Sequence, residues 1–495
     1  MTLGLLVILI SIAALIMSVL TGLFKRQVDN WLVTYLQYFT GSLFVFSGAV
    51  KAIDPLGTAY KMQDYFAAFE GVFEPTWFSF LAPLFASLNH YAVAFSVLMI
   101  VFEILLGILL LIGSWRRFTS WAFLLLVVFF TILTGFTYLT GYVPNGVNFF
   151  QFGQWGPFVE TNMKVTDCGC FGDFLKLPPR TSFLKDVFLL LPSLIFVYAW
   201  RSMHQLFSPA TRHLVIGVSV PVLILYCLSN YVWNLPDIDF RAFREGVNVR
   251  EQKAAEAEAM QAVEVIGYRL TEKDGGRVVE LPLDQYLAEF KNYPKEEWEL
   301  EQIQSEPALE PTKISDFIIN TPEGAPATEE ILDYPGHTLM VVAYTINGTS
   351  GIGAVTVTDT IWRQDTLSRG DSVVIERTPE RIVQREVRGE THNWAASYLQ
   401  PWTEVVNPVL AEAEAAGVRV LAVVGGAGAD KIEDFRHASQ SAYTFFAADD
   451  ILLKTIIRSN PGIVLWEDGA IVKKWHVNKL PDFSTMNERY LSRGE

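Results

Sequence analysis

The chain has 495 residues, of which 51% are hydrophobic and only 18% are charged, a composition typical of a protein that lies partly in a membrane. The averages hide two halves: long apolar runs extend to about Trp233, and the chain from Leu235 onward is mixed and acidic. The net charge of −15 comes mostly from this second half, which argues against nucleic acid or anionic lipid as its partner.

The first half contains apolar runs that are long enough to cross a membrane. A hydrocarbon core about 30 Å thick needs roughly 17–25 mostly apolar residues per helix. Six stretches meet this requirement and predict six transmembrane helices: 2–23, 32–52, 89–113, 118–140, 183–200 and 213–233. The first lacks a basic segment before it and a convincing cleavage site after it, so we interpret it as a retained helix rather than a signal peptide.

Lysine and arginine mark every second short loop and so predict the orientation. They lie at 25–26, at 116–117, and at Arg201 and Arg212, so these loops are expected to be cytoplasmic. The loops 54–88 and 141–182, with everything after Trp233, then face outward, which in a bacterium is the periplasm. We therefore expect a multi-pass protein of the bacterial inner membrane, in contact with the lipid bilayer, whose C-terminal domain is periplasmic.

Ionisable residues in or beside the apolar runs are candidate functional groups. Glu103 is the carboxylate placed deep in such a run, where it either has a functional role or hydrogen-bonds to a neighbouring helix. Lys51 and Asp54 lie at a helix end near water, which favours an interfacial cap or ion pair. Cys227, alone in the last run, is expected to pack as a small apolar residue.

The loop "TDCGCFGDFLKL", 166–177, holds the other two cysteines, Cys168 and Cys170. A Cys-x-Cys pair can close a small, strained disulfide ring that is easily reduced, which slightly favours redox exchange over a permanent staple or a packed, reduced pair. Metal ligation is disfavoured because no second Cys pair or His cluster completes a site. Asp167 and Asp173 flank the pair and are expected to raise the pKa of both thiols.

The second half predicts a soluble α/β region. Strand signals at 263–303 indicate a small module, and the acidic, proline-punctuated stretch 296–312 is expected to be a linker. From Ile314 to about Phe483 strands alternate with helices and end in a hairpin around "EDGA". "GGAGAD", 425–430, favours a strand-to-helix turn over a phosphate site.

This order of elements resembles the thioredoxin fold of TlpA-like proteins. The resemblance implies that "NPG", 460–462, occupies the place of the cis-proline loop of that fold. It also implies a Cys-x-x-Cys after the strand "MVVAYTI", but this chain has "WAAS", 394–397, there, after about forty extra residues that predict a hairpin insertion. The domain therefore cannot carry out dithiol chemistry by itself.

Other motifs resemble the DoxX/MauE-type redox-associated membrane proteins, in their long Bacteroidetes-type form, over nearly the whole chain. They are 41–66, "FEILLGILLLIGSWRR" with Glu103, the 166–177 loop, "FLKDVFLLL", "DFRAFREGVNV" and 453–475. The resemblance implies a helical bundle tied to thiol–disulfide chemistry or to the maturation of exported proteins, with a thioredoxin-like protein as partner. It carries over Cys168 and Cys170 as redox groups, and Glu103, Lys51 and Asp54 as bundle residues without an assigned role.

We therefore expect an α-helical membrane bundle with a four-helix core, followed by a soluble α/β thioredoxin-like domain. The expected parts are an N-terminal helix (1–24), the bundle (25–235), a linker with a small α/β module (236–312) and the thioredoxin-like domain (313–495). Two functions stay open. One is an oxidoreductase that relays disulfides through Cys168 and Cys170, with a quinone as acceptor by analogy alone. The other is a non-enzymatic scaffold or assembly factor of the cell envelope.

Overall fold

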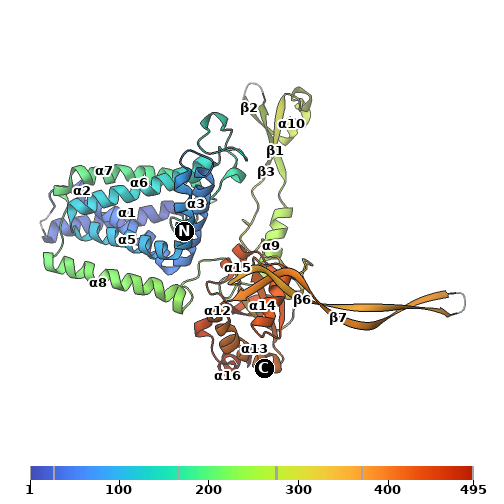
Figure 1. Ribbon diagram of the computed structural model, residues 1–495. Coiled ribbons are helices and arrows are strands. Elements are labelled where there is room, and N and C mark those ends of the chain that lie inside the picture. Colours follow the sequence, from blue (N-terminus) through green and yellow to red (C-terminus); the bar gives the residue numbers. More distant parts are fainter. Residues whose placement is uncertain (1, 26–27, 166, 274–276, 370–371, 493–495) are drawn as a thin grey trace. The chain divides into compact units, whose positions relative to one another are not determined.

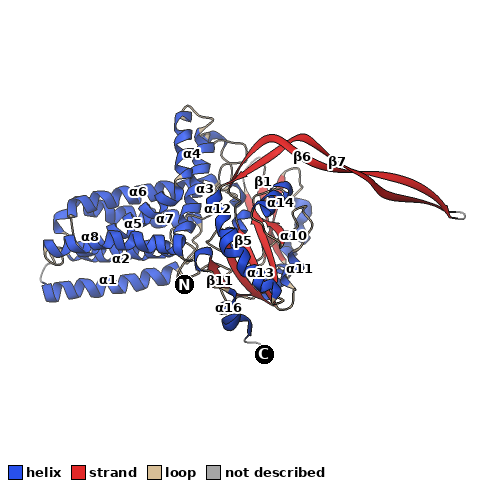
Figure 2. Cartoon of the chain, turned by 60° about the horizontal axis from the view of Figure 1, so that its bottom comes forward, coloured by secondary structure: helices blue, strands red, loops and turns tan. Residues whose placement is uncertain are grey.

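A computed structural model describes residues 2–25, 28–165, 167–273, 277–369 and 372–492. The chain divides into two compact units, Met1–Arg241 and Ala242–Glu495. The described part of the first unit is helical, whereas the second combines helices with β-sheets (Figures 1 and 2). The expected helical bundle followed by an α/β region is confirmed.

The first unit is built from long helices that run side by side (Figure 1). The α-helices of its described part are α1 (Leu3–Lys25), α2 (Trp31–Ile53), α3 (Pro55–Phe73), α4 (Ala82–His90), α5 (Ala92–Ile112), α6 (Arg116–Thr140), α7 (Pro179–Tyr198) and α8 (Pro209–Leu228). A π-helical turn, Ser229–Trp233, continues α8.

Five helical spans among the described residues are long and apolar enough to cross a membrane, where six were expected. They are Leu3–Phe24, Ala92–Ile112, Arg116–Thr140, Pro179–Tyr198 and Pro209–Trp233. The sixth stretch, 32–52, does form helix α2, but its polar residues lower its hydropathy. Five of them, Thr34, Gln37, Thr40, Ser47 and Lys51, are buried. Helix α2 therefore directs much of its polar surface into the bundle.

The segment 54–88, expected to be a loop, is largely helical. Asp54 accepts a hydrogen bond from the Gly57 backbone N–H at 3.0 Å, and Pro55 occupies the first turn of α3. Both features are strong signals for a helix start. Helix α3 then packs against α5, with Tyr65 and Phe66 buried.

A small antiparallel sheet opens the strand-containing part of the second unit, after helix α9 (Val249–Gln261). Its order is β2-β1-β3, from β1 (Val265–Glu272), β2 (Val278–Pro282) and β3 (Trp298–Gln304), with α10 (Leu283–Glu289) between β2 and β3. Strand β3 occupies the first part of the stretch 296–312, so the linker prediction was wrong there. The apolar residues Trp298 and Leu300 alternate with Glu299 and Glu301, which is the period of a half-buried strand.

The main sheet has six strands in the order β11-β10-β5-β8-β9-β4. The strands are β4 (Ile319–Asn320), β5 (His337–Ala343), β8 (Arg419–Gly425), β9 (Thr444–Ala448), β10 (Gly462–Glu467) and β11 (Ala470–His476). Strands β5, β8 and β9 are parallel, whereas β10 and β11 form an antiparallel hairpin beside β5. Residues 338–343 of β5 are all buried, as expected for a central strand covered on both faces.

The helices of this region are α11 (Thr328–Leu332), α12 (Ala396–Pro401), α13 (Asn407–Ala415), α14 (Ala429–Ala438), α15 (Asp450–Ile456) and α16 (Phe483–Met486). Trp402 and Phe435 lie in the core against strands of the sheet. The expected alternation of strands and helices is confirmed, and the turn at 425–430 joins β8 to α14. The Asn460–Pro461 peptide bond is cis.

The insertion between β5 and α12 is an antiparallel ribbon, as its alternating sequence predicts. It consists of β6 (Gly348–Arg369) and β7 (Ser372–Trp394), which pair with each other in a separate two-stranded sheet (Figure 2). Helix α12 starts directly after β7, so "WAAS" lies at the predicted strand-to-helix junction.

Candidate functional site

The cysteine loop turns tightly at Gly169. This residue has a φ of +60°, a left-handed conformation that glycine adopts without a steric cost, and its N–H donates to Asp167 Oδ1 at 3.0 Å. Lys61 Nζ on α3 lies 3.1 Å from Asp167 Oδ2. Burial opposes the charge of Lys61, but Asp167 and Asp64 outweigh it and raise its pKa. The turn is therefore fixed to α3 by an ion pair.

Cys170 lies against the apolar core of the bundle. Its side chain packs against the core cluster that contains Phe44, Leu106 and the neighbouring Phe171, whose side chain is buried. The Cys170 carbonyl oxygen lies 2.7 Å from Ser47 Oγ on α2. The loop is thus held to the bundle by packing and by a polar contact.

A buried ion pair lies next to this contact. Lys51 Nζ on α2 is 2.7 Å from Glu103 Oε2 on α5, and both side chains are less than a tenth exposed. Ser47 Oγ also lies 2.6 Å from Glu103 Oε1. A hydroxyl has one hydrogen, so Ser47 can donate to Glu103 or to the carbonyl of Cys170, but not to both at once.

One sequence interpretation changes here. Lys51 was expected in a cap or ion pair at a helix end near water; it does form an ion pair, but it is buried inside the bundle. Asp54 does cap a helix, as its position predicted. Glu103 indeed lies inside the bundle and contacts a neighbouring helix, and the structure connects it to the cysteine loop through Ser47.

A second ion pair, missed from the sequence, lies on α7. Lys185 Nζ pairs with the carboxylate of Asp186, which is 1% exposed, and the Thr134 hydroxyl on α6 lies 3.0 Å from Asp186 Oδ2. Lys185 Nζ also lies 5.8 Å from the centre of the Phe171 ring. Both residues stand in "FLKDVFLLL", inside the predicted span 183–200, where charges are costly enough to signal a site.

The two thiols have different surroundings. Burial raises the pKa of Cys168 to about 12, with a further contribution from Cys170, while hydroxyls of Ser182, Thr137 and Tyr65 act in the opposite direction. The hydroxyls of Tyr65 and Thr137 are 2.8 Å apart, so α3 and α6 meet beside Cys168. Cys168 thus faces neutral polar groups.

Cys170 faces charged groups. Burial raises its pKa, and Lys185 and Lys51 oppose this effect, whereas Asp186 and Glu103 add to it. Both ion pairs therefore interact electrostatically with this one sulfur. Two pairs on three helices, distant in the sequence, converge on Cys170.

The expected rise in thiol pKa is confirmed in direction, but its main cause is burial rather than the flanking carboxylates. Asp167 is paired with Lys61, and Asp173 Oδ1 lies 3.7 Å from Lys176 Nζ, so neighbouring cations offset both negative charges. Because the loop folds onto the bundle, desolvation of the thiols outweighs these partly exposed charges.

Cys227 behaves as its sequence context predicts. It is fully buried and packs with Ala52, Ile100 and Ile104. Across the described ranges, no group of three or more His, Cys, Asp or Glu side chains is arranged to hold a metal ion. The cysteine loop is therefore the place where thiol and charged groups come together.

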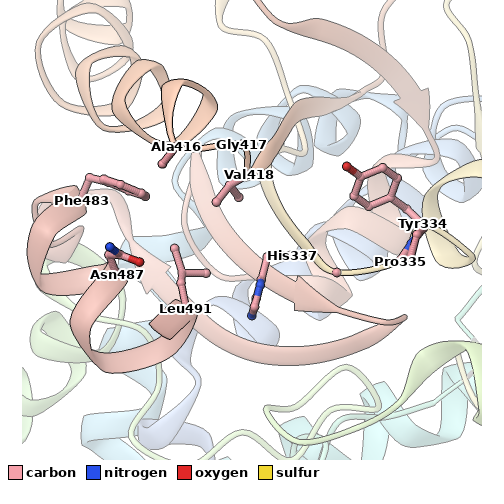
Figure 3. A pocket seen from close by; sticks show the side chains of 10 residues that line it. Tyr334, Pro335, His337, Ala416, Gly417, Val418, Phe483, Asn487 and Leu491 are labelled. Atoms are coloured by element: carbon pink, nitrogen blue, oxygen red, sulfur yellow. The ribbon is translucent and has the colours of Figure 1, made fainter. Parts of the chain in front are cut away.

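The second unit contains a cavity of about 290 Å³. Tyr334, His337, Phe483 and Asn487 are among the residues around it (Figure 3). His337 Nε2 lies 3.3 Å from Glu467 Oε1. The chain has no cysteine after Cys227, so this unit offers no thiol for exchange.

Comparison with known proteins supports the membrane assignment for one region. Residues 29–145 match the family described as "Methylamine utilisation protein MauE". The matched range covers α2 to α6 and includes Ser47, Lys51 and Glu103, but not the cysteine loop or α7. No curated protein and no solved structure matches the chain. The match is shorter than the resemblance expected over nearly the whole chain.

Proposed function

We propose that this multi-pass membrane protein, MauE-like over residues 29–145, carries out thiol–disulfide exchange through Cys168 and Cys170 and so supports the maturation of exported proteins. The observation that carries the proposal is that two ion pairs inside the bundle act on Cys170, one residue from the turn that holds Cys168. Charges in an apolar bundle are costly unless they serve packing or function, and here they lie around a thiol.

The second unit would dock the partner or client. A thioredoxin-like fold is supported by three neighbouring parallel strands and by the terminal hairpin β10–β11 beside them. Since this domain has no cysteine, electrons would pass through the bundle loop. A periplasmic location is supported by the alternation of basic loops, and a membrane quinone is an electron acceptor by analogy alone.

The exchange would follow the usual chemistry of thiols. A partner thiolate attacks one sulfur of the oxidised pair, forms a mixed disulfide and releases the other sulfur as a thiolate. The second partner thiol then resolves the mixed disulfide. Two electrons move from the partner dithiol to the pair, so the partner leaves oxidised and both loop cysteines become reduced.

The test follows the redox state of the pair in intact cells. Thiols are trapped with an alkylating mass tag in a Cys227→Ser background while the quinone pool or a periplasmic thiol partner is altered. We expect the oxidised fraction of Cys168 and Cys170 to change, and Cys168→Ser to reduce the amount of oxidised client. A pair that stays oxidised in every condition, with no loss of oxidised client in the variant, would contradict the exchange and favour the scaffold function.

A further inference from the structure

The different surroundings of the two sulfurs distinguish their roles in the proposed exchange. Cys168 lies beside the neutral hydroxyls of Tyr65, Thr137 and Ser182. Cys170 packs against the bundle core and interacts with the cations of Lys185 and Lys51. The two cations favour a thiolate at position 170 and so oppose burial and the carboxylates of Asp186 and Glu103, whereas no cation of the described residues acts in this way on Cys168.

We propose that a partner thiolate attacks the sulfur of Cys168 and that Cys170 is the leaving group, held beside Lys185, which acts as its positioning residue. This assignment rests on the proposed function. In thiol–disulfide exchange, the sulfur that leaves as the better stabilised thiolate leaves faster. Lys185 stands out because its ammonium lies over the ring of Phe171, the residue directly after Cys170.

In the first step the partner sulfur forms a bond to Cys168. The Cys168–Cys170 bond breaks at the same time, and its electron pair stays on Cys170. The second partner thiolate then attacks the partner sulfur bound to Cys168 and releases the thiolate of Cys168. Both loop thiolates take up protons from water, so one dithiol is oxidised and one disulfide is reduced.

The surrounding charges explain why neutralising Lys185 is informative. Asp186 pairs with Lys185, and Thr134 hydrogen-bonds to Asp186 from α6. Glu103 pairs with Lys51, and Ser47 Oγ lies within hydrogen-bond distance of both Glu103 and the Cys170 carbonyl oxygen. Removing the Lys185 charge leaves Asp186 beside the sulfur, which disfavours a thiolate there.

The first experiment maps the attacked sulfur in the unmodified full chain, purified in detergent. The pair is oxidised, exposed to a limited amount of glutathione and quenched with N-ethylmaleimide, and the peptides are identified by mass spectrometry. We expect glutathione on Cys168 and maleimide on Cys170. Glutathione on Cys170 would overturn the assignment and leave the proposed function intact, whereas a pair that forms no disulfide or never reacts would contradict the proposed function itself.

The second experiment tests Lys185 with matched variants. Lys185→Met is expected to slow glutathione exchange about tenfold and, in a Cys168→Ser background, to move the pH midpoint of Cys170 alkylation upward by about one unit. Lys185→Arg should restore both values, because it keeps the charge. Lys176→Met, on an exposed lysine of the same loop, should change neither.

A purely structural role for Lys185 would give a different pattern. The arginine variant would then fail to restore the pH midpoint, or Lys176→Met would lower the exchange rate as much as Lys185→Met. Either result would overturn the role of Lys185. The glutathione map of the unmodified chain stays decisive even if Lys185→Met does not fold.

Discussion

At the scale of single residues, the bundle depends on charges that are buried in pairs. Lys51 and Glu103 are each less than a tenth exposed and lie 2.7 Å apart. Such a pair adds little stability compared with apolar residues of the same size, but removing one partner leaves an uncompensated buried charge. Removal of either partner is therefore expected to destabilise the bundle.

We expect Glu103→Gln to lower the free energy of unfolding by about 3–5 kcal/mol, because Lys51 stays buried without its counter-charge. The double variant Lys51→Met, Glu103→Leu should recover most of this loss, because no charge remains. Thermal unfolding of the full chain in detergent measures both. A double variant as unstable as Glu103→Gln alone would show that the pair stabilises the bundle beyond mutual compensation.

The thiol of Cys168 is expected to react slowly at neutral pH. Its pKa is raised to about 12, and only the thiolate is nucleophilic, so its alkylation rate should rise about tenfold per pH unit between pH 7 and 10. The rate is measured with iodoacetamide in a Cys170→Ser, Cys227→Ser background. Ser397→Cys, which adds an exposed cysteine at the start of α12, is the comparison.

At pH 8, Cys168 should react roughly two or more orders of magnitude more slowly than the added cysteine at position 397. Equal rates would mean that the loop opens to water and that burial does not control the thiol.

At the scale of elements, α2 and α5 approach each other closely at glycines. A Cβ atom on Gly107 would lie 2.8 Å from the Gly41 carbonyl oxygen and 2.9 Å from the Val45 nitrogen, both backbone atoms that cannot rotate away. Small residues at helix contacts allow such close approach in membrane bundles. This contact brings Glu103 within reach of Lys51 and Ser47.

Gly107→Val should therefore separate α2 from α5 and destabilise the bundle by at least about 1–3 kcal/mol. Gly217→Ala on α8 is the control, because a Cβ there meets nothing within 4 Å. Thermal unfolding in detergent compares the two variants. A loss as large in Gly217→Ala as in Gly107→Val would argue against the close contact as the cause.

The elements themselves were largely predictable, and the exceptions have local causes. The helices followed from long apolar runs, and the alternation of strands and helices in the second unit, with its terminal hairpin, followed from the sequence pattern, whereas the strand order of the main sheet came from the structure. Helix α3 was missed because its apolar positions are mixed with polar ones, and β3 was missed because its glutamates suggested a linker. In both segments the spacing of the apolar residues indicated the helix or the strand, whereas their number did not.

At the scale of the whole molecule, the placement of basic loops predicts which side of the membrane each part occupies. The start of α8, with Ala210, should lie on the cytoplasmic side, and the second unit, with Ser397, should lie outside. Both residues are exposed, so each can carry a reporter cysteine.

In a chain whose three native cysteines are replaced by serine, a membrane-impermeant maleimide should label Ser397→Cys in intact spheroplasts. It should label Ala210→Cys only after lysis. The reverse pattern would place the cysteine loop and the second unit in the cytoplasm, where disulfides are rare, and would contradict exchange in the periplasm.

The sequence by itself determined the division into an apolar and an acidic half and most helices and strands, and it singled out Cys168, Cys170 and Glu103 as candidates, because these depend on composition and local patterns. Only the tertiary structure decided that Lys51, Glu103, Lys185 and Asp186 meet at Cys170. They come from α2, α5 and α7, and their meeting depends on glycine contacts and on the fold of a loop, which no local pattern specifies. The same packing partly buries both thiols and gives them unlike neighbours.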